Sequence, residues 1–271
     1  MVVFPNCKIN LGLQVVEKRP DGYHEIASVM YPVPINDILE IIPGKQSNDE
    51  VSFSGTKIPG KWEGNLIFKA IALLRQNFEI PPLKIHLHKA IPMGGGLGGG
   101  SSNGTYTLIL LNDLFDLNLS ENQLRDYASK LGSDCAFFVS NTPQLAKGRG
   151  EILQPISLSL AGKFLMLVND GTHISTQMAY GSIQPKLPSH SLIQIVGRAL
   201  KDWQGLLIND FEAPMMKQFP QLNAIKEKMM NNGAIYAAMT GSGSTMFGVF
   251  EKDIAIDFGL ENGFVHCVKL K

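Results

Sequence analysis

The sequence predicts an α+β protein with two domains. Strand patterns and helix patterns follow one another irregularly, whereas a doubly wound sheet would alternate them one for one. A glycine cluster separates a strand from a helix near residue 100, and a second glycine-containing loop separates two strands near residue 240. We place the first domain at residues 1–155 and the second at 156–271, because the strand predicted at 164–168 opens a new run of elements.

Alternation and turn residues predict a β-rich start. Apolar and polar residues alternate over residues 2–16, with Lys8 and Asn10 on the polar face, which is the period of a strand with two different faces. Asp21 and Gly22 form a turn signal. Further strands are predicted at 29–42 and 51–54, followed by a helix at 65–78 whose apolar residues recur at helical spacing.

The elements that follow surround the two glycine loops. Residues 83–91 alternate as a strand does, and the apolar run at 105–115 predicts a helix. Ser120, with Gln123 three positions later, predicts a capped helix that ends at Gly132. The second domain is predicted to contain a strand at 164–168, helices at 191–200 and 222–231, and a strand on each side of the loop at 240–245.

Glycine occupies six of the seven positions from Gly94 to Gly100. Glycine loses the most backbone entropy on folding, so such a cluster is costly unless the backbone adopts an unusual conformation there. Backbone amides of such a loop, followed by a helix N-terminus, bind anions well. The segment therefore predicts a cradle for the phosphates of a nucleotide. Ser101 and Ser102 are either the helix N-cap or contacts to phosphate or magnesium.

Three other interpretations of this loop fit less well. A P-loop requires lysine after the glycines, and here the serines follow directly. The dinucleotide fingerprint is formally matched by Gly94, Gly96 and Gly99, but the acids that follow, Asp113 and Asp116, close a helix rather than a second strand. A flexible linker would not lie between an amphipathic strand and a buried helix.

Composition argues against several classes of protein. Lysine and arginine together number 24, as do aspartate and glutamate, so the formal net charge is zero and nucleic acid is not expected as the main partner. The three cysteines lie far apart and form neither a zinc motif nor a disulfide framework. No apolar run approaches 18 residues, and a motif begins by Lys8, so we expect a cytoplasmic protein without a membrane span.

Phosphoryl transfer would need a carboxylate and a cation beside the phosphate loop. Asp134 is the candidate base, because it follows the helix stop at Gly132 and precedes an apolar run; the alternative is that it caps the next helix. Lys8 is the candidate cation, and its alternative is a solvated strand lysine. Neither residue is decisive alone.

Other polar residues have weaker signals. Tyr23 and His24 follow a turn, where they could bind a ligand or merely be surface residues. His86 and His88 share a strand face without a third ligand at a recognisable spacing, so we expect a solvated face and no metal-binding residues. Lys89, next to the loop, could reach a phosphate or a ribose.

Five motifs in a fixed order carry a family resemblance. They are Pro-Asn-Cys-Lys-Ile-Asn-Leu at 5–11, Arg-Pro-Asp-Gly-Tyr-His at 19–24, Ile-Pro-Met with the glycine loop at 91–103, Leu-Gly-Ser-Asp at 131–134 and Thr-Gly-Ser-Gly at 240–243. The set resembles the GHMP kinases. The Asp-Gly-Tyr-His element resembles the branch that phosphorylates 4-diphosphocytidyl-2-C-methyl-D-erythritol in non-mevalonate isoprenoid biosynthesis.

The resemblance implies the two-domain GHMP kinase fold, with an N-terminal domain like domain 2 of ribosomal protein S5 and a ferredoxin-like C-terminal domain. It implies ATP and Mg²⁺ as cofactors and the cytidyl alcohol as substrate. It implies no nucleic-acid or membrane partner, and a monomer or weak homodimer. Two alternatives stay open: a GHMP kinase for homoserine, mevalonate or another small alcohol, and a nucleotide-binding module without catalysis, such as an RNA-binding relative.

The resemblance also implies roles for particular residues. Asp134 would deprotonate the 2-hydroxyl group, and Lys8 would keep Asp134 ionised and stabilise the developing charge. The implied ATP-binding residues are Asn65, Lys89, Pro92, Met93, Gly94, Gly95, Gly96, Leu97, Gly98, Gly99, Gly100, Ser101, Ser102 and Asn103. The implied substrate-binding residues are Asn10 at the hydroxyl groups, Tyr23 and Tyr180 on either side of the cytosine, His24 hydrogen-bonded to it, and Thr176, Gly241 and Ser242.

Three positions depart from the family pattern. Cys7 and Ser133 stand where alanine is common, and Tyr180 stands where phenylalanine is frequent. The departures leave Lys8 and Asp134 unchanged.

Overall fold

The computed structural model describes residues 1–58, 60 and 62–271, and the chain divides into two compact units. Unit 1 comprises Met1–Cys7, Ile35–Met93 and Gly98–Thr142, and unit 2 comprises Lys8–Pro34, Gly94–Leu97 and Pro143–Lys271. The division differs from the single boundary predicted at residue 155. One cut cannot separate the units, because two long strands begin in one unit and continue in the other.

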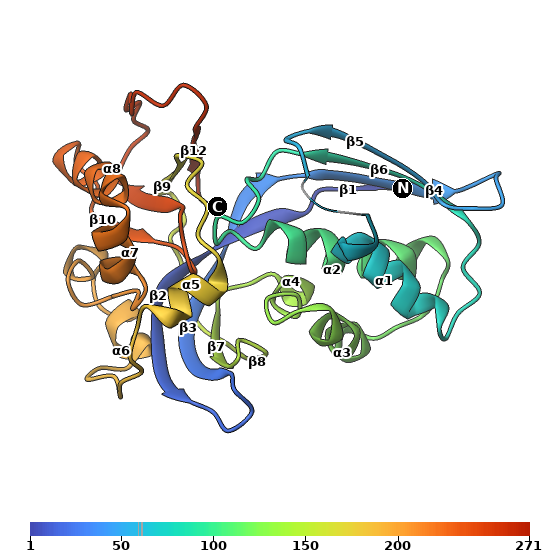
Figure 1. Ribbon diagram of the computed structural model, residues 1–271, viewed down its shortest axis with the longest axis horizontal. Coiled ribbons are helices and arrows are strands. Elements are labelled where there is room, and N and C mark those ends of the chain that lie inside the picture. The colour runs from blue at the N-terminus through green and yellow to red at the C-terminus, as the bar shows by residue number, and fades with distance from the viewer. Residues whose placement is uncertain (59, 61) are drawn as a thin grey trace. The chain divides into compact units, whose positions relative to one another are not determined.

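Unit 1 is a four-stranded sheet with helices packed on one face (Figure 1). The strand order is β1-β4-β6-β5, in which only the β5–β6 pair is parallel. Its elements are β1 (Val2–Val3), β4 (Ile38–Pro43), β5 (Glu50–Gly55), η1 (Trp62–Gly64), α1 (Leu66–Arg75), β6 (Leu83–Lys89), α2 (Gly99–Leu114), α3 (Glu121–Leu131) and α4 (Phe137–Ser140). Helix α2 packs against α1, α3 and α4 and contacts β1 and β4, so it lies at the centre of the helical layer.

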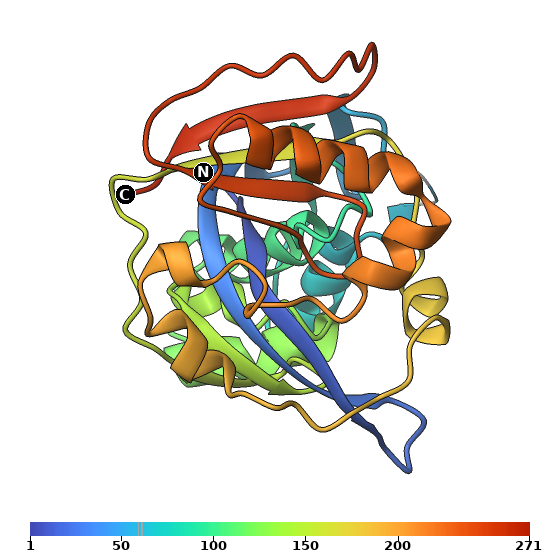
Figure 2. The same ribbon diagram turned by 90° about the vertical axis from the view of Figure 1, so that its left-hand side faces the viewer.

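Unit 2 contains two four-stranded sheets, ordered β2-β3-β7-β8 and β10-β11-β9-β12. Its strands are β2 (Asn6–Lys18), β3 (His24–Asn36), β7 (Gln144–Gly148), β8 (Ile152–Pro155), β9 (Phe164–Asn169), β10 (Tyr236–Met239), β11 (Met246–Phe250) and β12 (Phe264–Lys269). Its helices are α5 (Thr176–Gly181), α6 (Leu192–Val196), η2 (Leu200–Asp202), α7 (Glu212–Gln218) and α8 (Pro220–Asn231). Helix α8 packs on β10 and β11, as the orange helix over the red strands of Figure 2 shows.

Residue periodicity explains both cores. In unit 2, Leu222, Ile225 and Met229 fall on one face of α8 and pack into a core with Val168 and Met246 of the sheet. In unit 1, alternate residues of β6 are buried, while the intervening side chains point to the opposite face. Burying each large apolar side chain contributes about 1.5–3 kcal/mol, so these two patterns account for much of the stability of the units.

The exposed face of β6 differs from the solvated surface that we expected. His86 and His88 are half-buried, and their rings form hydrogen bonds of 2.8–3.0 Å with Ser52 and Ser54 of β5. Within residues 1–58, 60 and 62–271, no group of three or more histidine, cysteine, aspartate or glutamate side chains could hold a metal ion. That these histidines are not metal ligands remains a prediction.

Several predicted boundaries moved, each for a local reason. The strand predicted at 29–42 is two strands, because Asp37 interrupts it. Helix α2 begins at Gly99 rather than 105, since the glycines at its start adopt helical conformation. The helix predicted at 191–200 is the short α6 followed by η2. The box formed by Ser120 and Gln123 at the start of α3 is confirmed, with bonds in both directions.

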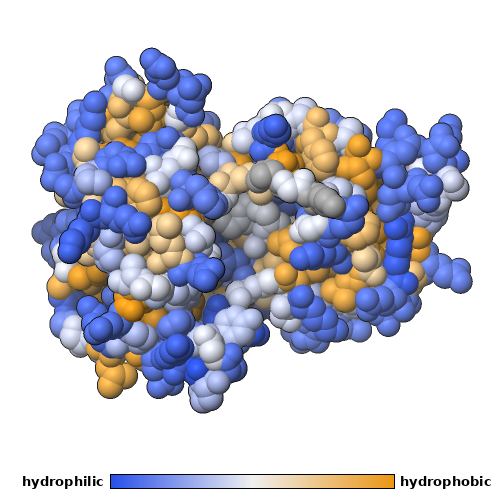
Figure 3. All heavy atoms as spheres, in the orientation of Figure 1, coloured by the Kyte–Doolittle hydropathy of each residue, from blue (hydrophilic) through white to orange (hydrophobic). Residues whose placement is uncertain are grey.

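Exposed hydrophobic side chains occur in small groups among hydrophilic ones on the face drawn in Figure 3. Such scattered exposure is normal for a folded domain. In the part of the chain that the structure describes, no helix has both the length and the apolar character needed to span a bilayer.

Candidate functional site

The backbone of the glycine loop (Pro92–Asn103) alternates between left-handed and other conformations. Gly94, Gly96 and Gly98 have φ angles of +68°, +76° and +68°, while the residues between them lie outside the left-handed region. Only glycine adopts positive φ without a steric cost. Alternation of this kind is typical of anion-binding nests, in which successive backbone N–H groups converge.

The middle of the glycine loop is anchored through three successive carbonyl oxygens. The backbone N–H of Thr245 donates to the Gly95 oxygen at 3.3 Å, and that of Lys8 donates to the Leu97 oxygen at 2.9 Å. Between them, the Thr240 hydroxyl donates to the Gly96 oxygen at 3.1 Å. Unit 2 thus holds its own segment of the loop by the carbonyl side of the backbone.

Close packing requires glycine in this loop. A Cβ atom on Gly96 would lie 2.2 Å from the Thr240 carbonyl oxygen, and one on Gly95 would lie 2.5 Å from the Thr245 hydroxyl. Gly241 is also tightly packed, because its Cβ would lie 3.0 Å from the Gly96 Cα. The two glycine loops therefore touch backbone to backbone, which larger residues would prevent.

Helix α2 begins at the end of the glycine loop. Its N-cap is Gly98, so the expectation that Ser101 or Ser102 is the N-cap is wrong; both lie inside the first helical turn. Ser102 is fully buried, and its hydroxyl oxygen has no hydrogen-bond partner among the described residues. The unsatisfied backbone N–H groups of a helix start give this end a positive potential.

Lys8 and Asn10 are buried, which rules out the solvated alternative for Lys8. Their side chains are 3% and 2% exposed, and the Lys8 ammonium group donates to the Asn10 Oδ1 atom. Asn10 in turn donates to the Ser28 hydroxyl at 2.7 Å, and Ser28 donates to the Gly12 carbonyl at 2.7 Å. The backbone N–H of Asn10 bonds the Thr240 hydroxyl at 3.0 Å. This chain of bonds fixes the ammonium group beside the segment that anchors the loop.

Asp134 is half-buried in the turn between α3 and α4. The N-cap of α4 is Ala136, so the alternative that Asp134 caps this helix is wrong. The Thr105 hydroxyl of α2 donates to the Cys135 carbonyl at 2.8 Å and ties this turn to α2. Lys8 belongs to unit 2 and Asp134 to unit 1, and their pairing remains a prediction.

Burial also marks the residue that follows Asp134. The Cys135 thiol is fully buried, and desolvation raises its pKa to about 11, with the charge of Asp134 acting in the same direction. Hydrogen bonds that involve Ser101 and Thr105 oppose this rise. The thiol is therefore protonated and unreactive at neutral pH.

Lys89 lies in a buried ion pair with Asp37. The two side chains are 1% and 0% exposed, and the Asp37 carboxylate also accepts bonds of 2.8–2.9 Å from the N–H groups of Ala90 and Ile91 and the Asn103 amide. Burial lowers the pKa of Lys89, and the neighbouring Asp37 opposes that shift. These contacts of Asp37 tie the end of β6 to the first turns of α2. The ATP-binding roles of Lys89 and Asn103 remain predictions.

Aromatic residues of unit 2 extend from its core toward the surface. Phe211 is buried and meets Tyr180 of α5 edge to face, with ring centroids 4.9 Å apart. Tyr180 stacks on His24 at 4.6 Å with 21° between the ring planes. Tyr23, the neighbour of His24, is 55% exposed. Thr176 is exposed one turn before Tyr180, so α5 presents both residues on one side.

The remaining predicted residues have structural partners. Asn65 is the N-cap of α1, and its side-chain oxygen accepts a 2.9 Å bond from the N–H of Ile67. Gly241 is held by Asn209, whose amide donates to the carbonyls of Met239 and Gly241 at 2.8 Å each. Ser242 follows in the same loop and is half-buried. Their predicted ligand contacts remain predictions.

Comparison with known proteins decides the family. The model for the GHMP kinases N terminal domain matches residues 65–142, and that for the GHMP kinases C terminal domain matches residues 190–261. A 4-diphosphocytidyl-2-C-methyl-D-erythritol kinase of Bacteroides fragilis is 46% identical over 276 residues, which covers all of both chains. The chain belongs to the 4-diphosphocytidyl-2-C-methyl-D-erythritol kinase family of GHMP kinases.

More distant members agree with this assignment. The kinase of the same name from Citrifermentans bemidjiense is 36% identical, covering 92% of this chain and 89% of its own. A crystal structure of 4-(cytidine 5'-diphospho)-2C-methyl-D-erythritol kinase superposes with a TM-score of 0.79 at 27% identity, covering 99% of both chains. The Methanococcus jannaschii mevalonate kinase, at 14% identity and a TM-score of 0.70, shows the shared fold alone. The predicted family and α+β GHMP kinase fold are confirmed.

GHMP kinases use ATP as the phosphate donor, generally with Mg²⁺. In kinase sites Mg²⁺ usually keeps several waters and is held by substrate phosphates together with one or two oxygen ligands from the protein. The buried hydroxyl of Ser102 at the start of α2 is the polar group that fits this role.

The predicted site left out three residues whose side chains bond predicted site residues. Asp37 interrupts a strand pattern, and that interruption was the available signal. Ser28 lies in a strand without any distinguishing neighbour. Thr240 precedes a glycine loop that was recognised, but its hydroxyl contact with the Gly96 carbonyl spans 144 residues. Only the folded chain brings these partners together.

Gly96→Ala is expected to destabilise the protein, and Gly100→Ala is not. Alanine at position 96 would adopt positive φ, at a cost of roughly 1–2 kcal/mol, and its Cβ would overlap the Thr240 oxygen. Gly100 is helical with open space around it, so alanine there should be neutral or stabilising by about 0.5–1 kcal/mol. Urea unfolding of both variants checks this; equal stabilities would contradict the packing role of Gly96.

Cys135 is expected to resist alkylation in the folded protein. With a pKa of about 11, roughly one thiol in a thousand is ionised at pH 8, and the side chain is fully buried. Cys267 is partly exposed and should react with iodoacetamide first, although burial raises its pKa as well. Peptide mass spectrometry follows the order, and unfolding in urea should abolish the difference. Equal native rates would contradict the burial of Cys135.

Proposed function

We propose that this protein transfers the γ-phosphoryl group of ATP to the 2-hydroxyl group of 4-diphosphocytidyl-2-C-methyl-D-erythritol. The observation that carries the proposal is 46% identity over the full length to kinases named for this substrate. The buried Lys8 network and the anchored glycine loop support the proposal, because such a reaction needs a fixed cation and a fixed phosphate-binding loop. On this proposal, the protein contributes to isoprenoid biosynthesis.

The glycine loop would bind the phosphates of ATP. Its carbonyl oxygens at Gly95, Gly96 and Leu97 are engaged with unit 2, so the amide side of the backbone is the side that would meet an anion. The start of α2 adds the positive end of its dipole. These groups, rather than net protein charge, would neutralise the triphosphate of a chain whose formal charge is zero.

In the transfer itself, the substrate hydroxyl oxygen forms a bond to the γ-phosphorus as the bond from that phosphorus to the β–γ bridging oxygen breaks, which releases ADP. The hydroxyl proton passes to the Asp134 carboxylate. The attacking group is a tertiary alcohol, which is hindered and weakly acidic, so its positioning should contribute more than the strength of the base. Mg²⁺, when bound, supplies charge neutralisation at the phosphates.

Lys8 would act as a fixed positive charge beside the reacting groups. Its ammonium group is directed by Asn10, and Asn10 is fixed by Ser28, so the charge needs little reorganisation when the phosphoryl group arrives. The backbone N–H of Lys8 also donates to the Leu97 carbonyl of the glycine loop. The same residue would therefore link the position of the loop to that of the charge.

The cytidine part of the substrate would bind near His24 and Tyr23. His24 would form hydrogen bonds with the base, Tyr23 would stack on one side of it, and Tyr180 would be the opposing aromatic ring. The present stack of His24 on Tyr180 keeps both rings at one place on unit 2. Thr176 would complete this pocket. Asn10 would contact the hydroxyl groups of the alcohol, and Gly241 and Ser242 would close over the substrate.

The alternative of a homoserine or mevalonate kinase has less support. The solved kinases of these types are 12–16% identical to the chain, which shows the shared fold and not the substrate. The enzymatic assignment also replaces the hypothesis of a nucleotide-binding module without catalysis. A cytoplasmic location and a monomeric or weakly dimeric state remain expectations.

Asp134→Asn is expected to lower kcat by about 10²–10⁴ with a smaller effect on KM, because the base is lost while the shape is kept. The measurement is ATP consumption with the cytidyl substrate present and absent, with Asp126→Asn of the exposed face of α3 as the matched control. If the wild-type protein consumed ATP at the same rate with and without the cytidyl substrate, the proposed function would be refuted. Near-normal turnover of Asp134→Asn would remove this residue from the mechanism.

A further inference from the structure

Two hairpin turns meet at one end of the β2-β3-β7-β8 sheet. The first joins β2 to β3 and carries Tyr23, and the second joins β7 to β8 and carries Arg149. Strands β3 and β7 pair directly, with Ile26 opposite Gly148. The guanidinium carbon of Arg149 lies 4.8 Å from the centre of the Tyr23 ring. An exposed aromatic ring thus has a planar cation over one of its faces.

The backbone around Tyr23 is fixed by its own turn. The N–H of Tyr23 donates to the Asp21 carboxylate at 3.1 Å, and its carbonyl accepts the N–H of Arg19 at 2.8 Å. The Arg19 guanidinium donates to Asp21 at 3.2 Å. These bonds hold the start of the Tyr23 side chain, but they leave its ring to be oriented by other groups.

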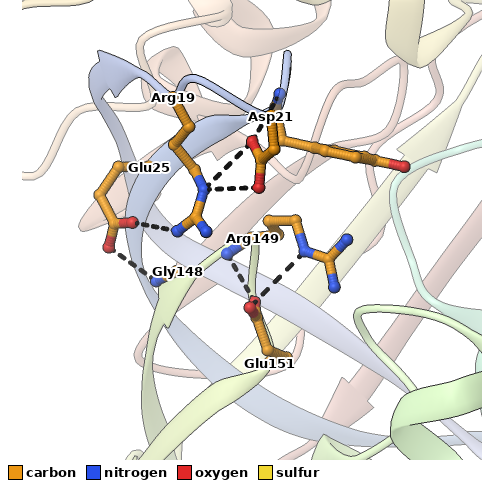
Figure 4. Close-up of polar contacts among 7 residues, drawn as sticks. Arg19, Asp21, Glu25, Gly148, Arg149 and Glu151 are labelled. Atoms are coloured by element: carbon orange, nitrogen blue, oxygen red, sulfur yellow. Dashed lines mark hydrogen bonds and ion pairs between the residues drawn. The ribbon is translucent and has the colours of Figure 1, made fainter.

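A continuous set of contacts connects this turn to Arg149 (Figure 4). The Arg19 guanidinium also donates to Glu25 at 3.0 Å, and the other oxygen of Glu25 accepts the backbone N–H of Gly148 at 2.8 Å. Arg149 follows Gly148 directly, and Glu151 accepts its backbone N–H and lies 3.6 Å from its guanidinium. The contacts therefore run from Tyr23 through Arg19 and Glu25 to Arg149 and back to the Tyr23 ring.

The energies involved favour a positioning role over a stabilising one. The Arg149 side chain is 41% exposed, and ion pairs at such sites contribute about 0–1 kcal/mol to stability. The Arg149 contact, however, biases the exposed ring of Tyr23 toward one orientation before any ligand arrives. Restriction in advance lowers the entropy lost on binding. The ring face opposite Arg149 is then the face available for stacking.

We propose that Arg149 is a positioning residue for nucleobase recognition, and that it orients the Tyr23 ring so that a cytosine stacks on the opposite face. The inference rests on the proposed function, because it takes the ligand to be a cytidine diphosphate derivative. A guanidinium group suits this role, since its planar form stacks on an aromatic ring better than an ammonium group does.

Arg149→Gln tests the proposal, with Lys147→Gln as the matched control that removes the same charge from the exposed side of β7. We expect Arg149→Gln to raise KM for the cytidyl substrate, and Kd for cytidine diphosphate by calorimetry, roughly two- to fivefold, the size of an exposed cation–π contact. The kcat and the KM for ATP should stay unchanged. Arg149→Lys should recover part of the affinity, and Lys147→Gln should match the wild type.

Three results would overturn the proposal. An unchanged KM and Kd in Arg149→Gln would show that the guanidinium does not orient the ring. An equal rise in Lys147→Gln would show a general attraction between positive charge and an anionic substrate. A parallel fall in kcat would show a structural fault. Wild-type protein that fails to bind cytidine diphosphate or to use the cytidyl substrate would instead refute the proposed function itself.

Discussion

The site depends on how the glycine loop is held. Its three central carbonyl oxygens accept bonds from Thr245, Thr240 and Lys8, and the absence of Cβ atoms at Gly95 and Gly96 allows the close approach that these bonds require. In a trans peptide the C=O and N–H groups point in opposite directions. When the carbonyl oxygens of the loop are bonded on one side, its N–H groups therefore point to the other side. The cost of ordering this glycine-rich segment is thus met during folding rather than when a nucleotide binds.

Buried polar pairs fix chain segments within each unit. Lys8 with Asn10 in unit 2, and Lys89 with Asp37 in unit 1, are almost completely removed from solvent. Removing one member of the Lys89–Asp37 ion pair would cost about 3–5 kcal/mol, because the remaining charge would lose its partner. Such pairs tolerate little displacement, so they set the positions of the chain segments that carry them.

Local patterns allowed much of the fold to be predicted from the sequence. The alternation in β6, the box at Ser120 and the strand–loop–helix order around the glycines depend on neighbouring residues, and all three are confirmed. The carbonyl anchors could not be predicted in this way, because Gly96 and Thr240 are 144 positions apart. The compact units do not follow a single cut in the sequence, since β2 and β3 contribute to both units, and the domain boundary at residue 155 stays a prediction.

Hydrogen exchange of individual amides, followed by NMR without nucleotide and with a non-hydrolysable ATP analogue, tests the central claim most directly. The account predicts that the amides of Lys8 and Thr245 are protected in the free protein, because they already bond the loop carbonyls. It predicts that the amides from Gly94 to Gly98 gain protection only with the analogue. Protection of Lys8 and Thr245 that appears only after the analogue binds would contradict the claim that the loop is held in place beforehand.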